Sequence, residues 1–178
     1  MTGTLPRVVL HPKKERSLLQ RHPWVFSGAI RSIDQGVSEG DWVEVIGSDG
    51  RFLGAGHFHE GSIKVRLLSF HPTVGEQQFW NERILAAYHL RERLGLTRSK
   101  QTTAYRLVHG EGDELPGLII DIYGDTAVVQ CHSWGMYRAL DQITEALIGC
   151  YGERLTTIFD KSADTLERQT ERKVDNRF

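Results

Sequence analysis

The sequence contains 178 residues, of which 39% are hydrophobic and 25% are charged, so it has enough apolar material for one good core or two small ones. Its apolar runs are far shorter than the roughly 20 residues that cross a bilayer, and its first residues lack the apolar core of a signal peptide. We therefore expect a cytoplasmic protein with no membrane partner. The net charge of −1 argues against a generic nucleic-acid binder.

Positive charge is nevertheless concentrated at one end of the chain. Residues 1–31 hold six lysines and arginines and a single acidic residue, which gives a local charge of +5, whereas the rest of the chain is mildly acidic. A polyanion would therefore meet one basic end rather than a basic molecule.

Residues 1–72 predict a small β-barrel, the first of two domains. Residues 63–68 alternate apolar and charged side chains, and Gly47–Gly50 separates two apolar runs as a hairpin turn would. Residues 11–20 predict one or two helical turns that are basic on one side. The five expected strands are Arg7–Leu10, Arg21–Ile30, Gly40–Ile46, Arg51–Phe58 and Ile63–Leu68.

The highest density of turn residues in the second part lies within Tyr105–Asp125. Its glycines at 110, 112 and 117 and its proline at 116 join two β-rich runs, Tyr105–Val108 and Leu118–Ile122. A further turn leads into a third run, Thr126–Cys131. Three consecutive strands joined by turns predict a β-meander.

Amphipathic helices flank this meander. The helix expected over Gly75–Leu94 carries an apolar stripe, and a second helix expected from Gly135 to Gly149 precedes a last strand at Thr156–Phe159. Residues after Leu166 show no packed pattern. The predicted fold class is α+β, with a small barrel in residues 1–72 and a small α+β domain in residues 73–178. The stripe comprises Trp80, Ile84, Ala87, Leu90 and Leu94.

The first of these helices also predicts an interaction surface. Opposite its apolar stripe we expect an exposed charged face, which bears Arg83, Arg91, Glu92 and Arg93. This face would serve another domain or a second copy of the chain, so a homodimer is one possible assembly.

The glycine-rich turn allows several chemical interpretations. Gly110-Glu111-Gly112 after a strand resembles a nucleotide-binding loop, but such a loop needs a helix directly after it, and strand residues follow Pro116 here. The carboxylates of Glu111, Asp113 and Glu114, with His109 beside them, suggest a metal or acid/base cluster. Acidic residues in a solvated turn are the commoner case, so their role stays open.

The cysteines give a weak signal. Cys131 and Cys150 have no CxxC spacing and no neighbouring histidine pair, so zinc and redox sites are disfavoured. Cys131 and His132 are also the nearest candidates for a nucleophile and a base. We expect two half-buried thiols instead.

Two stretches together carry a family resemblance. RHPWVFSGAI, within the basic N-terminal region, and YRLVHGEGDELPGLIIDIYGD resemble the SAM-dependent cytosine-C5 methyltransferases that act on large-subunit ribosomal RNA. The resemblance extends over roughly Arg7 to Arg168. It implies an N-terminal PUA RNA-binding domain and a small central α+β domain, with ribosomal RNA as the partner.

The same resemblance carries an expectation about what the chain lacks. In that family the glycine-rich SAM loop, an Asp-Pro-Pro-type motif and the catalytic cysteine belong to a C-terminal Rossmann-like domain. None of these motifs occurs in this sequence, and neither cysteine matches the nucleophile. We therefore expect the chain by itself to bind no cofactor and to methylate nothing, with SAM required by the full-length family enzyme.

The basic end is the predicted RNA-binding site. Lysines and arginines would position the RNA backbone, a tryptophan could stack on an exposed base or belong to the core, and a glycine would allow close approach of a phosphodiester. The alternative is a stand-alone RNA-binding or scaffold protein without catalysis. The candidate contacts are Lys13, Lys14, Arg16, Arg21, His22, Trp24, Gly28 and Arg31.

Overall fold

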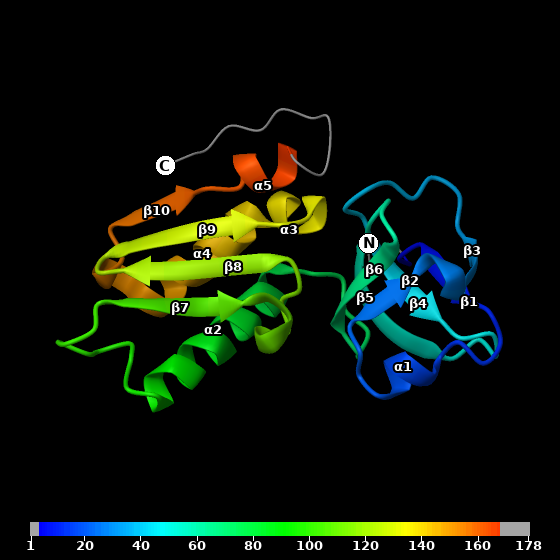
Figure 1. Cartoon of the computed structure of the whole chain (residues 1–178), viewed down its shortest axis with the longest axis horizontal. Helices are drawn as coiled ribbons and strands as arrows, with labels where there is room; N and C mark the ends of the chain where they lie inside the picture. Colours follow the sequence, from blue (N-terminus) through cyan, green and yellow to red (C-terminus); the bar gives the residue numbers. More distant parts are fainter. Residues whose placement is uncertain (1–3, 168–178) are drawn as a thin grey trace. The chain divides into compact units, whose positions relative to one another are not determined.

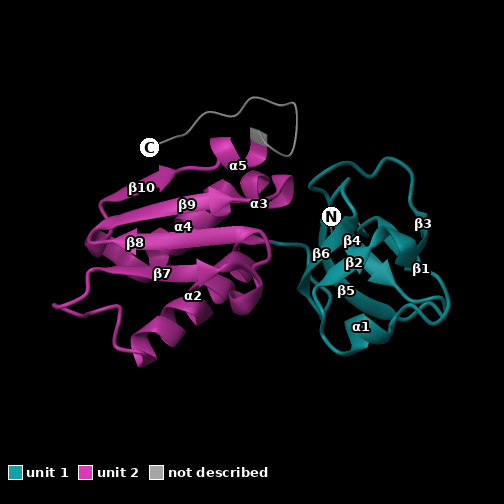
Figure 2. Cartoon of the chain, in the orientation of Figure 1, with its two compact units in different colours: residues 1–75 teal, residues 76–178 magenta. Residues whose placement is uncertain are grey.

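The computed structural model of the chain describes residues 4–167. The chain divides into two compact units, residues 1–75 and residues 76–178, each of which has its own sheet (Figure 1, Figure 2). Across the described part, every helix is too short or too polar to cross a lipid bilayer.

The N-terminal unit is a mixed six-stranded sheet with the strand order β2-β6-β5-β4-β1-β3. Neighbouring strands are antiparallel except for β1 and β4, which run parallel. A short helix, α1 (Arg16–Leu19), lies between β1 and β2 in the chain. The strands are β1 (Arg7–Leu10), β2 (Trp24–Phe26), β3 (Ile30–Ile33), β4 (Trp42–Ile46), β5 (Phe52–Phe58) and β6 (Ile63–Ser69).

The second expected strand, Arg21–Ile30, is in fact two strands. A single 3-10 turn, η1 (Ser27–Ala29), separates β2 from β3, and these strands form the opposite edges of the sheet. Because only three residues join the two edges, the sheet must curl strongly. Close packing inside it is visible at Gly56, where an added Cβ would lie 2.0 Å from the carbonyl oxygen of Arg66.

The predicted five-stranded barrel is therefore wrong. Within residues 4–167 the hydrogen-bonded ladder does not close between β2 and β3, so the sheet is an open, mixed one. Alternation identifies which residues form strands, but it carries no information on which strands pair, and the parallel pairing of β1 with β4 leaves no local sequence signal.

Alternating side chains of these strands form the core of the N-terminal unit. Val43, Val45 and Val65 are fully buried, as is Val8 on β1. The two glycines on either side of the β4–β5 turn fit the predicted hairpin, since β4 and β5 pair in antiparallel register. Trp24 is only half-buried and lies outside this core cluster.

The C-terminal unit is a mixed four-stranded sheet with the order β10-β9-β8-β7. The predicted meander forms β7, β8 and β9, and the last strand joins it parallel to β9. In Figure 1 the two long helices, α2 and α4, lie behind this sheet, and they pack against each other. The strands are β7 (Ala104–His109), β8 (Leu118–Tyr123), β9 (Thr126–Cys131) and β10 (Thr157–Asp160).

The helices differ from prediction at their ends. The second expected helix is broken at Ala139 into two helices, and the second of these continues beyond Gly149. Residues 168–178, for which the sequence predicts no packed pattern, lie outside the described part. The helices are α2 (Gln77–Arg93), α3 (Trp134–Arg138), α4 (Leu140–Tyr151) and α5 (Ala163–Glu167), with 3-10 turns η2 (Gly110–Asp113) and η3 (Gly152–Arg154).

The buried face of α2 differs from the predicted apolar stripe after Ala87. Trp80, Ile84 and Ala87 are buried, but Leu90 and Leu94 are exposed, and the buried face continues through Arg91 instead. The predicted arginine face is therefore wrong for Arg91, whose guanidinium is buried by a carboxylate from the meander turn.

That carboxylate belongs to Asp113. The guanidinium of Arg91 donates from both terminal nitrogens to Asp113, with 2.8 Å from Nη2 to Oδ2, and from Nε to the carbonyl oxygen of Arg106 at 2.9 Å. Asp113 also accepts from the backbone N–H of His109 at 2.6 Å. One ion pair thus fixes α2, β7 and η2 to one another.

Candidate nucleic-acid interface

The segment from residue 11 to residue 22 folds into a turn followed by α1. Lys13 and Arg21 both adopt left-handed backbone conformations, with φ of 67° and 61°. Arg21 ends α1 in a Schellman motif, because its N–H donates to Leu18 O at 2.9 Å and the next N–H, of His22, donates to Ser17 O at 3.0 Å. Glycine is the usual residue at this position, so the chain places a strained arginine where glycine would fit better.

The four candidate cations of this segment are exposed. They are Lys13, Lys14, Arg16 and Arg21. None of the four makes an ion pair within residues 4–167, although the Arg21 guanidinium lies 5.4 Å from the centre of the Phe70 ring. Their charges are therefore available to a partner.

Alternate residues at the start of β2 form a row of aromatic rings, which we call the aromatic row: Trp24 and Phe26 on the strand, and His22 two residues before it. Neighbouring ring centres are 5.6 Å and 6.2 Å apart in edge-to-face arrangements. Phe26 is 48% exposed and His22 is also exposed, while Trp24 is half-buried. The backbone N–H of Trp24 donates to His22 Nδ1 at 3.2 Å, which holds the imidazole in place.

The turn, the aromatic row and β3 meet around η1. The N–H of His11 donates to Ala29 O at 2.9 Å, which ties the basic turn to η1, and η1 connects the aromatic row to β3. Arg31 lies exposed on β3. The fold thus brings the N-terminal candidates to the region where the two sheet edges are joined.

Gly28, the predicted point of close phosphodiester approach, has open space around it. It lies within η1, has no left-handed φ, and a Cβ added to it would meet no atom within 4 Å. No contact within the described residues requires glycine here.

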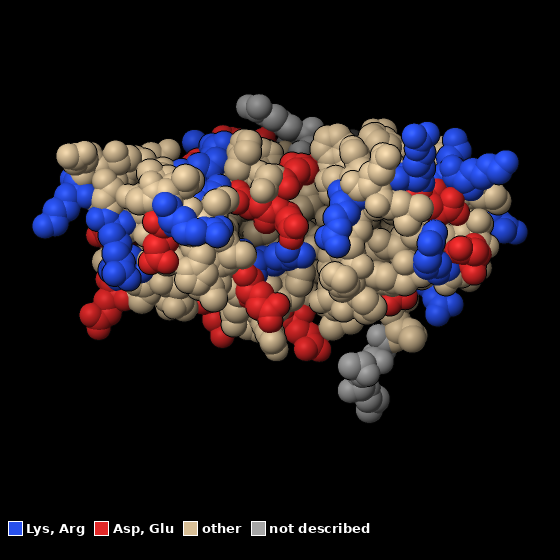
Figure 3. Space-filling model, turned by 90° about the horizontal axis from the view of Figure 1, so that it is seen from below, with Lys and Arg blue, Asp and Glu red and all other residues tan. Residues whose placement is uncertain are grey.

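One acidic side chain lies among the basic residues. Glu15 accepts hydrogen bonds from the backbone N–H and the hydroxyl of Ser48, at 3.3 Å and 3.1 Å. Backbone hydrogen bonds, first from Glu15 itself and then from Ser48, lower the pKa of this carboxyl group. On the face that Figure 3 shows, lysine and arginine side chains (blue) outnumber aspartate and glutamate side chains (red) over the N-terminal unit, at the right of the view.

Sequence reasoning missed Phe26. It stands two residues after Trp24, so the spacing of His22, Trp24 and Phe26 along a strand was the available signal that all three rings share one face. The same spacing argues against a core position for Trp24, because buried Val25 occupies the opposite face.

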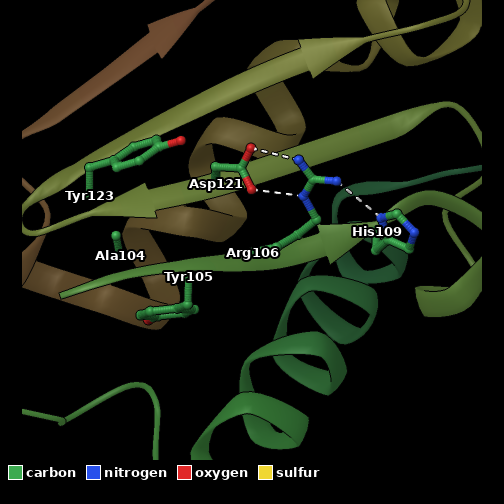
Figure 4. Close-up of a pocket in the computed structure, with 6 residues that line it drawn as sticks. All are labelled: Ala104, Tyr105, Arg106, His109, Asp121 and Tyr123. Atoms are coloured by element: carbon green, nitrogen blue, oxygen red, sulfur yellow. Dashed lines mark hydrogen bonds and ion pairs between the residues drawn. The ribbon is translucent and has the colours of Figure 1, made fainter. Parts of the chain in front are cut away.

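A second surface feature lies on the face of the C-terminal sheet opposite α2 and α4. A cavity of about 480 Å³ has Arg106, His109, Asp121 and Tyr123 among its lining residues (Figure 4). Arg106 binds Asp121 through two hydrogen bonds of 2.8 Å and 3.0 Å, and its remaining nitrogen lies 3.2 Å from His109 Nδ1. The hydrogen bond to Asp121 raises the pKa of Arg106, so the two charges satisfy each other.

Two carboxylates of the meander turn form ion pairs with arginines of α2. Asp113 is bound to Arg91, and Glu114 forms an ion pair with Arg83, whose guanidinium also lies over Phe79. Within residues 4–167 no three acidic, histidine or cysteine side chains come together as metal ligands would. The turn is followed by the strand β8 rather than by a helix, so it lacks the helix that a nucleotide-binding loop needs.

Cys131 is not suited to act as a nucleophile. Burial raises the pKa of this thiol to about 12, so the reactive thiolate is strongly disfavoured near neutral pH. Cys150 is half-buried, and burial raises the pKa of its thiol as well.

Comparison with known protein families bears on the N-terminal unit first. Residues 8–70 match the family model of a PUA-like domain. The N-terminal sheet, with its basic turn and aromatic row, is therefore a PUA-like domain.

Curated relatives cover more of the chain. It is 40% identical over 144 residues to Ribosomal RNA large subunit methyltransferase I of Shewanella denitrificans, a match that covers 79% of this chain and 36% of that protein. It is 35% identical over 159 residues to the protein of the same name from Salmonella arizonae, covering 88% and 38%. The chain is thus a close homologue of these proteins and spans less than two fifths of their length.

Solved structures show the same fold. A candidate SAM-dependent methyltransferase from Streptococcus mutans superposes with a TM-score of 0.75 at 22% identity, over 88% of this chain and 40% of that one. A second methyltransferase structure, complexed with SAH, gives a TM-score of 0.74 at 21% identity, over 89% and 41%.

These structures overturn the predicted fold class as a whole. That prediction described a barrel and a small α+β domain set apart from the methyltransferase fold. The two mixed sheets instead superpose on 40% and 41% of two solved methyltransferase chains. The prediction relied on the absence of a cofactor-loop motif from the sequence. The presence or absence of such a motif does not determine how the strands of a chain pair into sheets.

Proposed function

We propose that the chain is the RNA-docking part of a SAM-dependent ribosomal RNA methyltransferase, with its N-terminal unit as the docking module. The observation that carries this proposal is the arrangement around η1, where exposed cations without acidic partners lie beside an exposed aromatic row. The PUA-like match and the rRNA methyltransferase relatives support RNA as the partner.

Two kinds of contact follow from this arrangement. The lysines and arginines of the basic turn and α1 would displace counterions from RNA phosphates, which provides affinity without sequence preference. The aromatic row would stack on a base that is not paired, as aromatic side chains do in RNA-binding proteins. The site residues proposed are Lys13, Lys14, Arg16, Arg21, His22, Trp24 and Arg31, with Phe26 added.

Finer parts of the proposal rest on the relatives and on the sequence resemblance. Cytosine C5 is the proposed methylation position and SAM the proposed methyl donor of the full-length protein, and the SAH-bound neighbour supports SAM. A cytoplasmic location follows from ribosomal RNA as substrate. Self-association through α2 has less support, because Arg83 and Arg91 are engaged in ion pairs.

The test is the salt dependence of RNA binding. If about three to five phosphates are contacted, log K should fall against log salt with a slope near −0.9 per contact for a duplex or −0.7 for a single strand. Replacing Lys13, Lys14 and Arg16 together with alanine should weaken binding to all RNA sequences and flatten the slope by roughly two to three units.

The matched control removes equal charge from the other unit. Arg93, Lys100 and Lys161 are exposed and lie on α2, on a loop and after β10, so their triple alanine variant should leave affinity and slope nearly unchanged. The proposal fails if this control abolishes binding while the N-terminal triple variant retains the affinity and slope of the parent.

A further inference from the structure

A second cavity lies on the helix face of the C-terminal sheet, between α4 and the edge strand β10. Its volume is about 380 Å³. Leu140, Thr144 and Ile148 of α4 line one side, and Ile158 of β10 lines the other. Ile148 is 54% exposed, so a large apolar side chain beside the cavity remains open to solvent.

One end of this cavity contains a buried carboxylate with an unused oxygen. Asp160 is 3% exposed, and its Oδ1 accepts from both the N–H (3.0 Å) and the hydroxyl of Ser162. Ser162 is itself held by the N–H of Cys131 at 2.9 Å. Asp160 Oδ2 has no hydrogen-bond partner within residues 4–167, although it is buried.

An unpaired buried carboxylate oxygen is costly, so the position of Asp160 needs an explanation. A buried polar group without a partner loses its hydration and gains nothing in exchange. The two bonds from Ser162 fix the carboxylate, and register places Asp160 beside Val129, which faces the helices. The unused oxygen therefore lies on the cavity's face of the sheet and requires a hydrogen-bond donor.

The negative charge of the cavity lining indicates that this hydrogen-bond donor is a cation. Asp141 of α4 also lines it, so two carboxylates face the space, and no lysine or arginine is among its lining residues. Lys161 follows Asp160 in the chain, but alternation directs its side chain to the opposite face of the sheet. A guanidinium group matches this site, because its planar donors can serve two acceptors while its aliphatic stem lies along apolar side chains.

The open edge of β10 indicates how such a group would be delivered. Among the described residues the sheet ends at β10. The N–H groups of Thr157 and Lys161 are directed toward the β9 side, where they bond Asp125 O and Val129 O at 3.3 Å and 2.8 Å. By alternation the backbone groups of Ile158 and Asp160 point to the open edge, where an extended segment can pair.

We propose that this cavity binds an arginine side chain carried by an extended peptide segment that adds to the edge of β10. The segment's backbone pairs with Ile158 and Asp160, and its arginine enters the cavity to donate to Asp160 Oδ2 and to Asp141. The stem of the arginine packs on Leu140 and Ile148. The site is separate from the RNA-binding surface, so the two proposals stand independently.

The contrast with the cavity in Figure 4 supports this assignment. There, Arg106 and Asp121 neutralise each other through two hydrogen bonds, so the cavity needs no charged ligand. Between α4 and β10 the acidic groups have no such partner within residues 4–167, so the proposal assigns the cation to an added peptide segment.

The experiment uses a blocked pentapeptide of sequence threonine-valine-arginine-valine-threonine and the full chain, titrated by amide NMR. Saturable shifts should appear in Thr157–Asp160 and in the first half of α4. The same peptide with citrulline, the neutral isostere of arginine, should bind at least tenfold more weakly. N-butylguanidinium should also bind at least tenfold more weakly than the arginine peptide, because it lacks the backbone pairing.

Two variants separate a binding role from a structural one. Asp160→Asn keeps the acceptor for Ser162 but removes the buried charge, so it should reduce peptide affinity at least tenfold while raising the Tm of the free protein. Glu145→Gln, an exposed one-charge change on α4 outside the cavity, should alter neither.

Three outcomes would overturn the proposal. Equal binding of the citrulline and arginine peptides would show that the charge is not recognised. Equal binding of N-butylguanidinium would make the ligand a small cation rather than a peptide segment. A lower Tm for Asp160→Asn with unchanged peptide affinity would show that Asp160 only supports the fold.

Discussion

The two units use their arginines in opposite ways. In the C-terminal unit Arg83, Arg91 and Arg106 each bind a carboxylate from a neighbouring segment, and these pairs connect α2 to the meander turn and β7 to β8. In the N-terminal unit the cations of the basic turn and α1 have no acidic partner within the described residues, and Arg21 even occupies a strained backbone position. The same residue type therefore holds the fold in one unit, whereas in the other it is exposed and is proposed to bind a polyanion.

The sharpest test of this contrast removes Arg91. Its side chain is 10% exposed and Asp113 is 4% exposed, so Arg91→Ala leaves a buried, uncompensated carboxylate. Breaking such a pair should cost about 3–5 kcal/mol of unfolding free energy, measured by urea denaturation. Lys14→Ala serves as the control in the other unit and should change stability by less than about 0.5 kcal/mol. Comparable losses in the two variants would remove the distinction between the units.

Trp24 offers the next largest effect. Since it is half-buried on the aromatic row, Trp24→Ala should weaken RNA binding by about 1–3 kcal/mol, the usual contribution of a stacking aromatic. Its folding cost should be well below the roughly 3–5 kcal/mol of a core tryptophan.

Trp80, which is completely buried in α2, is the matched control for the folding cost. Trp80→Ala should show the full core penalty of about 3–5 kcal/mol in thermal or urea unfolding. If Trp24→Ala costs as much as Trp80→Ala and RNA affinity is unchanged, Trp24 is a packing residue.

A smaller effect is expected at Arg21. Arg21→Gly removes one charge and relieves a left-handed backbone that costs an arginine about 1–2 kcal/mol, partly offset by the flexibility of glycine in the unfolded chain. The variant should be as stable as the parent or slightly more so. Its RNA salt slope should flatten by about one unit. A marked loss of stability would mean that the contact with Phe70, not RNA, explains this arginine.

The smallest effect concerns the acidic side of the N-terminal unit. Burial alone would raise the pKa of Glu39, but hydrogen bonds from His59 and from the N–H of Glu60 more than offset it, so the pKa lies below the ordinary 4.5. A lowered folded-state pKa contributes stability that is present above the unfolded value and lost as pH falls through the folded one. The unit should therefore lose stability as pH drops below about 4.5, and Glu39→Gln should flatten this dependence in acid titrations followed by circular dichroism.

Much of the local structure could be predicted from sequence, but pairing between distant elements could not. Alternation located β4, β6 and the meander, and turn residues placed the loop before β8. The sequence could not show that Arg91 would be buried, because its partner Asp113 lies 22 residues further along and is bound through tertiary structure. The same limit applies to the order of strands in the N-terminal sheet.

For the candidate site, charge was visible in the sequence and conformation was not. The density of lysine and arginine in residues 1–31 marks a basic surface whatever the fold. The left-handed conformation of Arg21 depends on how α1 ends, that of Lys13 on the turn before α1, and the exposure of Phe26 on β2 being an edge strand. Whether these residues contact RNA stays a prediction.

The parallel pairing of β1 with β4 has a consequence for synthesis of the chain. β1 is made first, yet its partner residues, Glu44 to Ile46, follow more than thirty positions later, and β3 is attached to the sheet through β1. On a ribosome, residues 7–10 can pair with β3 first, but their other edge stays unpaired until β4 has emerged. The ribosome that synthesises the chain itself contains RNA, which is a polyanion. The basic residues 7–31 are therefore exposed to RNA before the sheet of the N-terminal unit is complete.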